Sequence, residues 1–233
     1  MKEKRFRSAL SLLTNLSIVF FMIESIRNHF RADVIKVFDQ MTGNSWEFFR
    51  YFTSLSNIFV TIAAIVMIVF SIRNIARNEF KTPMWAIQLK FISTLTVTLT
   101  MVTVVFFLAP TWAVKGDGYF ALFRGSNLFM HFLTPLTAIL TMIFLESTSD
   151  LPFKTVFVSM IPVGIYTFFY ILFVVFIKIW PDFYGFTFGG KLWIAPISLV
   201  VMAAVTFGLA ALLWKLQKVA GAKFRCGKQQ EKQ

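Results

Sequence analysis

Long runs of apolar residues, separated by short polar connections, extend through the whole chain of 233 residues. A helix needs about 20 predominantly apolar residues to cross a bilayer, and the chain offers runs of this length throughout. Tryptophan rings favour the headgroup level of a membrane, and the 6 tryptophans lie at or just beyond the ends of these runs. Two independent patterns therefore predict an all-α, polytopic membrane bundle of six transmembrane helices, in a single membrane domain over residues 1–233. The predicted spans are Ala9–Ile26, Phe49–Ile72, Trp85–Ala109, Asn127–Leu145, Val156–Ile179 and Leu192–Trp214.

The composition also favours a membrane protein. The chain is 57% hydrophobic and 15% charged, with a mean hydropathy of +0.71, which is more apolar surface than one soluble core can bury. We therefore expect the lipid bilayer to be its solvent. The net charge of +12 does not predict a nucleic-acid partner, because the Lys and Arg residues lie between the apolar runs. The single cysteine, Cys226, excludes an internal disulfide framework and a multi-thiolate metal site.

The basic residues predict the orientation of the bundle. Most of the 23 Lys and Arg residues lie in the two terminal segments and in the second and fourth connections. Positively charged segments resist translocation, so we expect both termini to be cytoplasmic, with residues 215–233 as a basic tail. No small-residue cleavage site follows the basic N-terminal flank, so the first span is expected to be a retained anchor. In the first outer connection, an apolar stripe that includes Val34 and Phe38 predicts an amphipathic surface helix.

Polar side chains inside apolar spans are the first candidates for a functional site, because they are costly unless they are buried against partners. Thr53 and Asn57 lie in the segment Tyr51–Asn57, at the outer end of the second span. Their spacing of four residues puts them on one helical face. A structural alternative stays open, since hydroxyl and amide groups often bond the backbone or a neighbouring helix in membrane bundles.

His131 is the one histidine inside a predicted span. The second and fourth spans run in the same direction, and they place Thr53 and His131 at similar distances from their outer ends. A neutral imidazole at that depth can take a proton from a hydroxyl, as a general base does for a weak nucleophile. Pro135 leaves the carbonyl of His131 without its helical donor, which adds a polar acceptor. A structural histidine bonded to a neighbouring helix is the alternative.

Two further groups of polar residues lie in the spans. Glu24, near the outer end of the first span, is placed to orient an imidazole, bind a cation or carry a proton. The alternative is an ion pair with Arg27, three residues further on. In the third span, we expect the hydroxyl groups from Ser93 to Thr100 to bond mostly their own helix. Lys90 is expected to extend toward the inner headgroups.

Three of these features occur together in a known family. The segment Tyr51–Asn57, the pair His131 and Pro135, and the aromatic loop Trp180–Phe186 resemble the androgen-induced protein family. These are multipass membrane hydrolases with six-span bacterial relatives, and the resemblance covers most of the chain in order and topology. It implies a threonine nucleophile at Thr53, a histidine partner at His131, and a lipid ester as substrate in a bacterial cell membrane. The loop departs from the bacterial relatives, which often carry Tyr-Pro-Tyr-Pro-Phe there.

The expected function is therefore hydrolysis of a fatty-acyl ester in the outer half of the bilayer, without a metal or other cofactor. Asn57 or Asn127 would donate a hydrogen bond to the oxyanion, and Glu24 would lie at the same level. The sequence contains no HExxH motif, phosphate loop or acidic metal cluster. Two other functions stay open. The first is a small transporter or lipid-binding protein with a polar site at Glu24, Asn57 and His131, and the second is a structural subunit whose polar residues join helices. The oligomeric state is not predicted.

Overall fold

The computed structural model describes residues 2–30, 45–79, 81–148, 150–185, 187 and 192–230, and over these residues its regular elements are all helices. The predicted amphipathic helix around Val34 and Phe38 lies outside the described residues. The elements are α1 (Lys2–Phe30), η2 (Ser45–Arg50), α2 (Phe52–Arg77), α3 (Met84–Thr103), η3 (Val104–Leu108), α4 (Ala109–Lys115), η4 (Tyr119–Phe123), α5 (Ser126–Leu128), η5 (Phe129–Leu133), α6 (Thr134–Leu140), η6 (Thr141–Leu145), α7 (Lys154–Ser159), α8 (Ile161–Ile171), η7 (Leu172–Phe176), η8 (Leu192–Ile194) and α9 (Ala195–Gln230).

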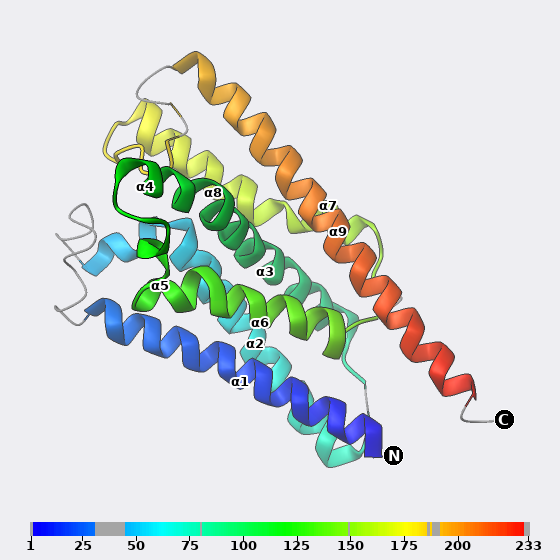
Figure 1. Ribbon diagram of the computed structural model, residues 1–233. Helices are drawn as coiled ribbons and strands as arrows, with labels where there is room; N and C mark the ends of the chain where they lie inside the picture. Colours follow the sequence, from blue (N-terminus) through cyan, green and yellow to red (C-terminus); the bar gives the residue numbers. More distant parts are fainter. Residues whose placement is uncertain are drawn as a thin grey trace.

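Six helical segments in the described part of the chain are long and apolar enough to cross a membrane, which confirms the predicted all-α, six-span fold (Figure 1). Several of them are made of consecutive elements: α3, η3 and α4 form the third span, and α5, η5, α6 and η6 form the fourth. The two ends of the chain lie at the same end of the bundle. The spans are Arg5–Asn28, Phe52–Arg77, Met84–Lys115, Ser126–Leu145, Lys154–Phe176 and Ala195–Lys223.

Two helices continue well past the ends that hydropathy predicts. The third span continues through Trp112 to Lys115, and α9 continues through Trp214 to Gln230. After Trp214 the residues become polar, but they are mostly good helix formers and include no proline. The apolar stretch therefore ends near Trp214, whereas the helix continues to Gln230.

Small side chains bring four of the spans together at the centre of the bundle. Ala64 of α2 and Ala138 of α6 are fully buried beside Ile18, Val60 and Val97. Small residues at such crossings let helix backbones approach closely. Large apolar side chains instead cover the outward faces, where lipid chains are their natural partner. On α2 these are Ile62, Ile65, Val69 and Ile72.

Two prolines shape the helices near the candidate site. Pro110 and Pro135 each follow a π-helix, η3 and η5, at the second position of the next α-helix. A proline clashes with the carbonyl four residues earlier and cannot donate to it. In η5 that carbonyl belongs to His131, and the wider turn closes instead through Thr134 N–H to the Phe129 carbonyl. His131 therefore lies in the middle of a π-helix because of Pro135.

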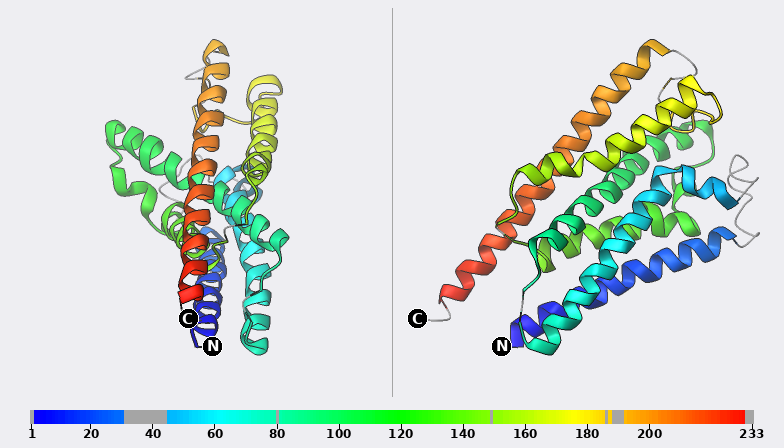
Figure 2. Two further views of the ribbon diagram at one scale, coloured as in Figure 1. Left: turned by 90° about the vertical axis from the view of Figure 1, so that its right-hand side faces the viewer. Right: turned by 180° about the vertical axis from the view of Figure 1, so that it is seen from behind.

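Helix α9 is packed firmly over only part of its length. Ala210 and Leu213, in the half nearer the termini, are buried in a core cluster with Phe91 of α3. In the other half, Ile197 and Val201 are 55% and 56% exposed. Figure 2 shows α9, α8 and α4 diverging toward the end of the bundle opposite the termini. The splayed helices leave room for a cavity between them.

Candidate functional site

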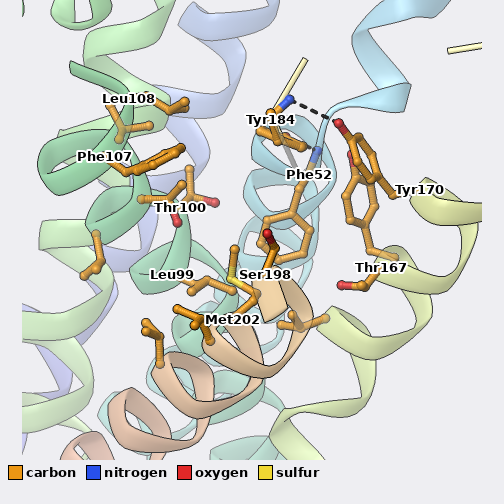
Figure 3. A pocket seen from close by; sticks show the side chains of 18 of the residues that line it. Phe52, Leu99, Thr100, Phe107, Leu108, Thr167, Tyr170, Tyr184, Ser198 and Met202 are labelled. Atoms are coloured by element: carbon orange, nitrogen blue, oxygen red, sulfur yellow. Dashed lines mark hydrogen bonds between the residues drawn. The ribbon is translucent and has the colours of Figure 1, made fainter. Parts of the chain in front are cut away.

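A cavity of about 480 Å³ lies between α2, α3, η3, α8 and α9, in the half of the bundle opposite the termini (Figure 3). Its volume is within the range of ligand pockets in proteins, about 300–1,000 Å³. Most of its wall is apolar and includes Leu99, Phe107, Leu108, Val163 and Met202. Such a wall suits a hydrocarbon chain.

Thr53 lines this cavity at the start of α2. The N-cap residue, Tyr51, offers no side-chain hydrogen bond to the helix, so the first N–H groups need another acceptor. The Tyr184 hydroxyl supplies it and accepts from the Phe52 N–H at 2.9 Å. The Thr53 N–H and hydroxyl also interact with the Tyr184 hydroxyl. A phenol from a distant loop therefore caps α2 beside the candidate nucleophile.

The environment keeps the Tyr184 phenol neutral. Burial raises the pKa of Tyr184 to about 12, and hydrogen bonds from Phe52, Tyr166 and Thr53 act in the opposite direction. A neutral phenol can both donate and accept a hydrogen bond. Tyr184 is consequently a donor as well as an acceptor at this end of the cavity throughout the physiological pH range.

A hydrogen-bonded loop holds Tyr184 in place. Its N–H donates to the Tyr170 hydroxyl at 3.1 Å, and that hydroxyl donates to the Asp182 carboxylate at 2.8 Å. The second carboxylate oxygen of Asp182 accepts from the Thr187 hydroxyl at 2.6 Å. Because Tyr170 belongs to α8, these bonds fix the loop to the fifth span.

His131 is buried in η5 with one ring nitrogen fixed. Its Nδ1 lies 2.8 Å from the Leu122 carbonyl oxygen in η4. A carbonyl only accepts, so Nδ1 carries a proton, and Nε2 is the basic nitrogen of the neutral ring. An acceptor at Nδ1 is the arrangement that orients a histidine for work as a general base through Nε2.

Asn57 joins the segments that carry Thr53 and His131. Its amide nitrogen donates to the Thr53 carbonyl at 2.8 Å and to the Met130 carbonyl at 3.2 Å. The two predicted residues therefore lie on adjoining segments at nearly one level. In the described part of the chain, no direct hydrogen bond connects the Thr53 hydroxyl to the His131 ring. The Asn57 amide N–H groups are both committed, which leaves neither for an oxyanion.

The cavity wall also links the two residues. Val104 of η3 lines the cavity together with Thr53. On another side, Val104 packs in one buried cluster with Leu122, whose carbonyl holds His131. Thr53 and the residue that packs against the support of His131 therefore line the same cavity, and His131 itself is not among the lining residues.

The other predicted site residues are less closely connected to the cavity. Glu24 forms an ion pair with Arg27 at 2.5 Å, the alternative that the sequence left open. Asn127 is half-buried in α5, one turn before His131, and its backbone N–H donates to the Arg124 carbonyl at 3.1 Å. Neither is among the residues that line the cavity.

In α3 one expectation is confirmed and one is wrong. The hydroxyl groups of the run do bond their own helix: Ser93, Thr96 and Thr98 donate to carbonyls three or four residues earlier. Lys90, however, does not reach the headgroups. Its side chain is completely buried, and its Nζ donates to Asn15 Oδ1 at 2.6 Å. A polar partner on another helix holds it inside the bundle.

Sequence reasoning gave no role to Tyr184, Tyr166 or the Leu122 carbonyl. A tyrosine-rich loop was visible, but helical periodicity does not indicate where a loop docks. Three polar residues in the terminus-side half of the bundle were visible in the sequence: Asn15 within the first span, Lys90 near the start of the third, and Glu146 directly after the fourth.

The fold and the cavity define a class, a multi-pass all-α membrane protein with an apolar cavity between splayed helices. No family model, curated protein or solved structure matches the chain. The described residues also contain no group of three or more His, Cys, Asp or Glu side chains that could hold a metal ion.

Proposed function

We propose that the protein is an integral membrane hydrolase that cleaves a fatty-acyl ester, with Thr53 as nucleophile and His131 as general base. The observation that carries the proposal is the Thr53 hydroxyl, which lies beside a neutral phenol in a mostly apolar cavity. The apolar wall would hold the acyl chain, and the hydroxyl groups would face the ester. The family resemblance points to the same pair of residues.

The reaction would proceed through an acyl-threonine. His131 Nε2 takes the proton of the Thr53 hydroxyl, directly once substrate is bound or through one water, because catalytic hydrogen bonds are often loose in the free enzyme. The Thr53 oxygen attacks the ester carbonyl, and the leaving alcohol takes the proton back from the imidazolium. Water, activated by the same histidine, then releases the fatty acid.

The oxyanion needs a hydrogen-bond donor, and the neutral Tyr184 phenol suits this role better than Asn57. Its hydroxyl already interacts with the Thr53 hydroxyl and would turn its O–H from Tyr166 to the oxyanion, whereas the Asn57 amide is committed to two backbone carbonyls. A donor of this kind contributes about 2.7–4 kcal/mol in other hydrolases.

The opening of the cavity suits a substrate that arrives from the membrane. The outer half of α9 is splayed from α8, and its apolar side chains are exposed (Figure 2). A lipid ester would enter between these two helices without leaving the bilayer. With the termini on the cytoplasmic side, this opening faces the outer leaflet of a bacterial cell membrane.

A fluorophosphonate probe tests the nucleophile. Membranes that contain the wild type, Thr53→Ala or His131→Ala are labelled, and hydrolysis of a long-chain acyl ester is measured in parallel. We expect no labelling of Thr53→Ala, and a loss of about 10²-fold or more in rate for His131→Ala, the usual contribution of a general base.

Thr61→Ala is the matched control on the same helix. The Thr61 hydroxyl donates to the Asn57 carbonyl at 2.7 Å, and Thr61 is not among the cavity-lining residues, so labelling should persist. Labelling that survives Thr53→Ala would rule out the proposed nucleophile. A wild type that is neither labelled nor active would instead indicate lipid binding or transport without catalysis.

A further inference from the structure

A second cluster of polar side chains lies in the half of the bundle that carries the termini, away from the Thr53 cavity. Lys90 Nζ of α3 donates to Asn15 Oδ1 of α1 at 2.6 Å. The Asn15 amide nitrogen donates to Glu146 Oε1, just after η6, also at 2.6 Å. The Ser11 hydroxyl donates to the same carboxylate oxygen at 2.9 Å. An asparagine therefore connects a lysine with a glutamate across three spans.

The cluster is buried almost completely. Lys90 and Asn15 are 0% exposed and Glu146 is 4% exposed. Charged groups inside a membrane protein are costly, face the interior or water, and typically carry ions or protons. An ionised Lys90 and an ionised Glu146 together carry no net charge, which lowers the free-energy cost of burying them without removing it.

Several polar atoms in and around the cluster have no hydrogen-bond partner among the described residues. The second carboxylate oxygen of Glu146, Oε2, is buried and unpaired, and so are the Thr94 and Thr141 hydroxyls. Thr94 lies one helical turn after Lys90, and Thr141 lies in the turn before Glu146. Buried polar atoms are nearly always satisfied, so this concentration needs an explanation.

The other charged groups near the cluster either have partners or face outward. Arg7 of α1 donates to the Leu145 carbonyl and to the Ser147 hydroxyl, both at 2.8 Å. Where burial is described, the remaining cations of these helices have exposed side chains. They are Arg5 and Arg27 on α1, Arg73 and Arg77 on α2, Lys154 on α7, and Lys215, Lys218 and Lys223 on α9. Lys90 is thus the cation that hydrogen bonds connect to Glu146 through Asn15.

The unsatisfied groups specify the chemistry of a ligand. An ammonium group has three donors, of which Lys90 uses one on Asn15, and Glu146 Oε2 requires a donor. A simple cation would satisfy the carboxylate and repel Lys90, and a simple anion would do the reverse. Water both donates and accepts, and it can carry a proton to the carboxylate.

We propose that Lys90, Asn15 and Glu146 form an internal, hydrated proton-binding site on the terminus side of the bundle. A hydronium ion transfers its proton to Glu146 Oε2 and leaves as water, so that the carboxylate becomes a neutral acid and the cluster gains one positive charge. Asn15 neither gains nor loses a proton in this step. Its hydrogen bonds hold Lys90 and Glu146 at a constant separation. The site is separate from the proposed hydrolase site and does not depend on it.

Infrared spectroscopy of the full-length protein in phosphatidylcholine vesicles tests this proposal. Spectra are recorded between about pH 4 and about pH 9, and the carbonyl stretch of a protonated carboxylic acid is followed in H₂O and in D₂O. We expect one component of the band to grow as the pH falls and to shift in D₂O, and we expect this component to be missing from Glu146→Gln, which keeps the bands of the other carboxyl groups. In Lys90→Met the pH response of this band should differ from that of the wild type, because the neighbouring amino group is removed.

Glu24→Gln and Thr53→Ala are the controls. Glu24 is paired with Arg27 at the opposite end of the bundle, and Thr53 lies in the cavity, so both variants should keep the band. If Glu146→Gln does not fold, Glu146→Asp keeps the carboxyl group and should change the position of the band. A wild type without a titrating carboxylic acid, or a band that none of the Glu146 and Lys90 variants alters, overturns the proposal.

Discussion

At the scale of single residues, the Tyr184 hydroxyl connects a loop to the first turn of α2. It accepts the Phe52 N–H and interacts with the Thr53 hydroxyl. It therefore completes a helix end and brings a proton donor close to the proposed nucleophile. Capping and proposed catalysis depend on the same atom.

Tyr184→Phe should destabilise the protein by about 1 kcal/mol, because α2 loses an acceptor for one of its first N–H groups. The loss should also depend on pH. Tyrosine ordinarily titrates near about pH 10, and Tyr184 titrates at about 12 in the folded protein. The unfolded chain therefore ionises first, and the stability from this group is complete below pH 10 and declines between pH 10 and 12.

Thermal unfolding in detergent, measured at several alkaline pH values, checks this expectation. The stability of the wild type should fall more steeply with rising pH in that window than the stability of Tyr184→Phe. Parallel curves for the two proteins would show that Tyr184 does not titrate differently in the folded and unfolded states.

Single residues were predictable from the sequence where one helix determines their environment. Most hydroxyl groups of the run in α3 bond their own helix, as their type and spacing indicated. Lys90 was not predictable in this way, because its hydrogen-bond partner, Asn15, comes from α1, and the Glu146 side chain that Asn15 binds follows η6. A one-dimensional pattern contains no information on which polar residues of different spans meet. The same limit applies to Tyr184, which a loop delivers to α2.

Among the elements, α9 determines the shape of the cavity. Its terminus-side half is fixed by Ala210 and Leu213 in the core, and its other half lines the cavity with Met202. A larger side chain on the cavity-lining face of α9 should shorten the part of the cavity that can hold an acyl chain. The packed half of α9 should not be affected.

Met202→Trp should therefore reduce hydrolysis of long-chain acyl esters more than hydrolysis of short-chain esters. The measurement is the ratio of kcat/KM for the two esters, and about a tenfold fall in the long-to-short ratio is expected, since losing one or two methylenes of burial costs about 1–1.5 kcal/mol. Val200→Trp is the control, because Val200 is 70% exposed and is not among the lining residues. An equal change in the ratio for both variants would contradict the assignment of the cavity as the chain-binding site.

The helices themselves were largely predictable, because lipid imposes a minimum apolar length on every span. The ends of the helices and their π-helical turns were less predictable. The third and sixth spans continue past Trp112 and Trp214, where hydropathy falls but helix propensity does not. The proline at position 135 indicated a freed carbonyl at His131, and the structure resolves it as a π-helix. The splaying of α9 depends on contacts between helices and had no signal in the sequence.

The whole molecule places both ends of the chain on one side (Figure 1). The excess of Lys and Arg on that side predicts that it is cytoplasmic. Fusions of green fluorescent protein and of alkaline phosphatase to the C-terminus measure the orientation in bacterial cells. The fluorescent fusion should be bright and the phosphatase fusion inactive. The opposite pair of results would reverse the orientation and turn the cavity toward the cytoplasmic leaflet.

Because α9 is fixed along only half its length, α8 and α9 are splayed on the outer side of the cavity. In a bilayer, surrounding lipid chains would complete the cavity wall there. The width available to a substrate then depends on the lateral pressure and thickness of the membrane as well as on the protein. Bilayer composition would then regulate the proposed activity. In a detergent micelle, detergent chains would replace the lipid chains on that side of the site.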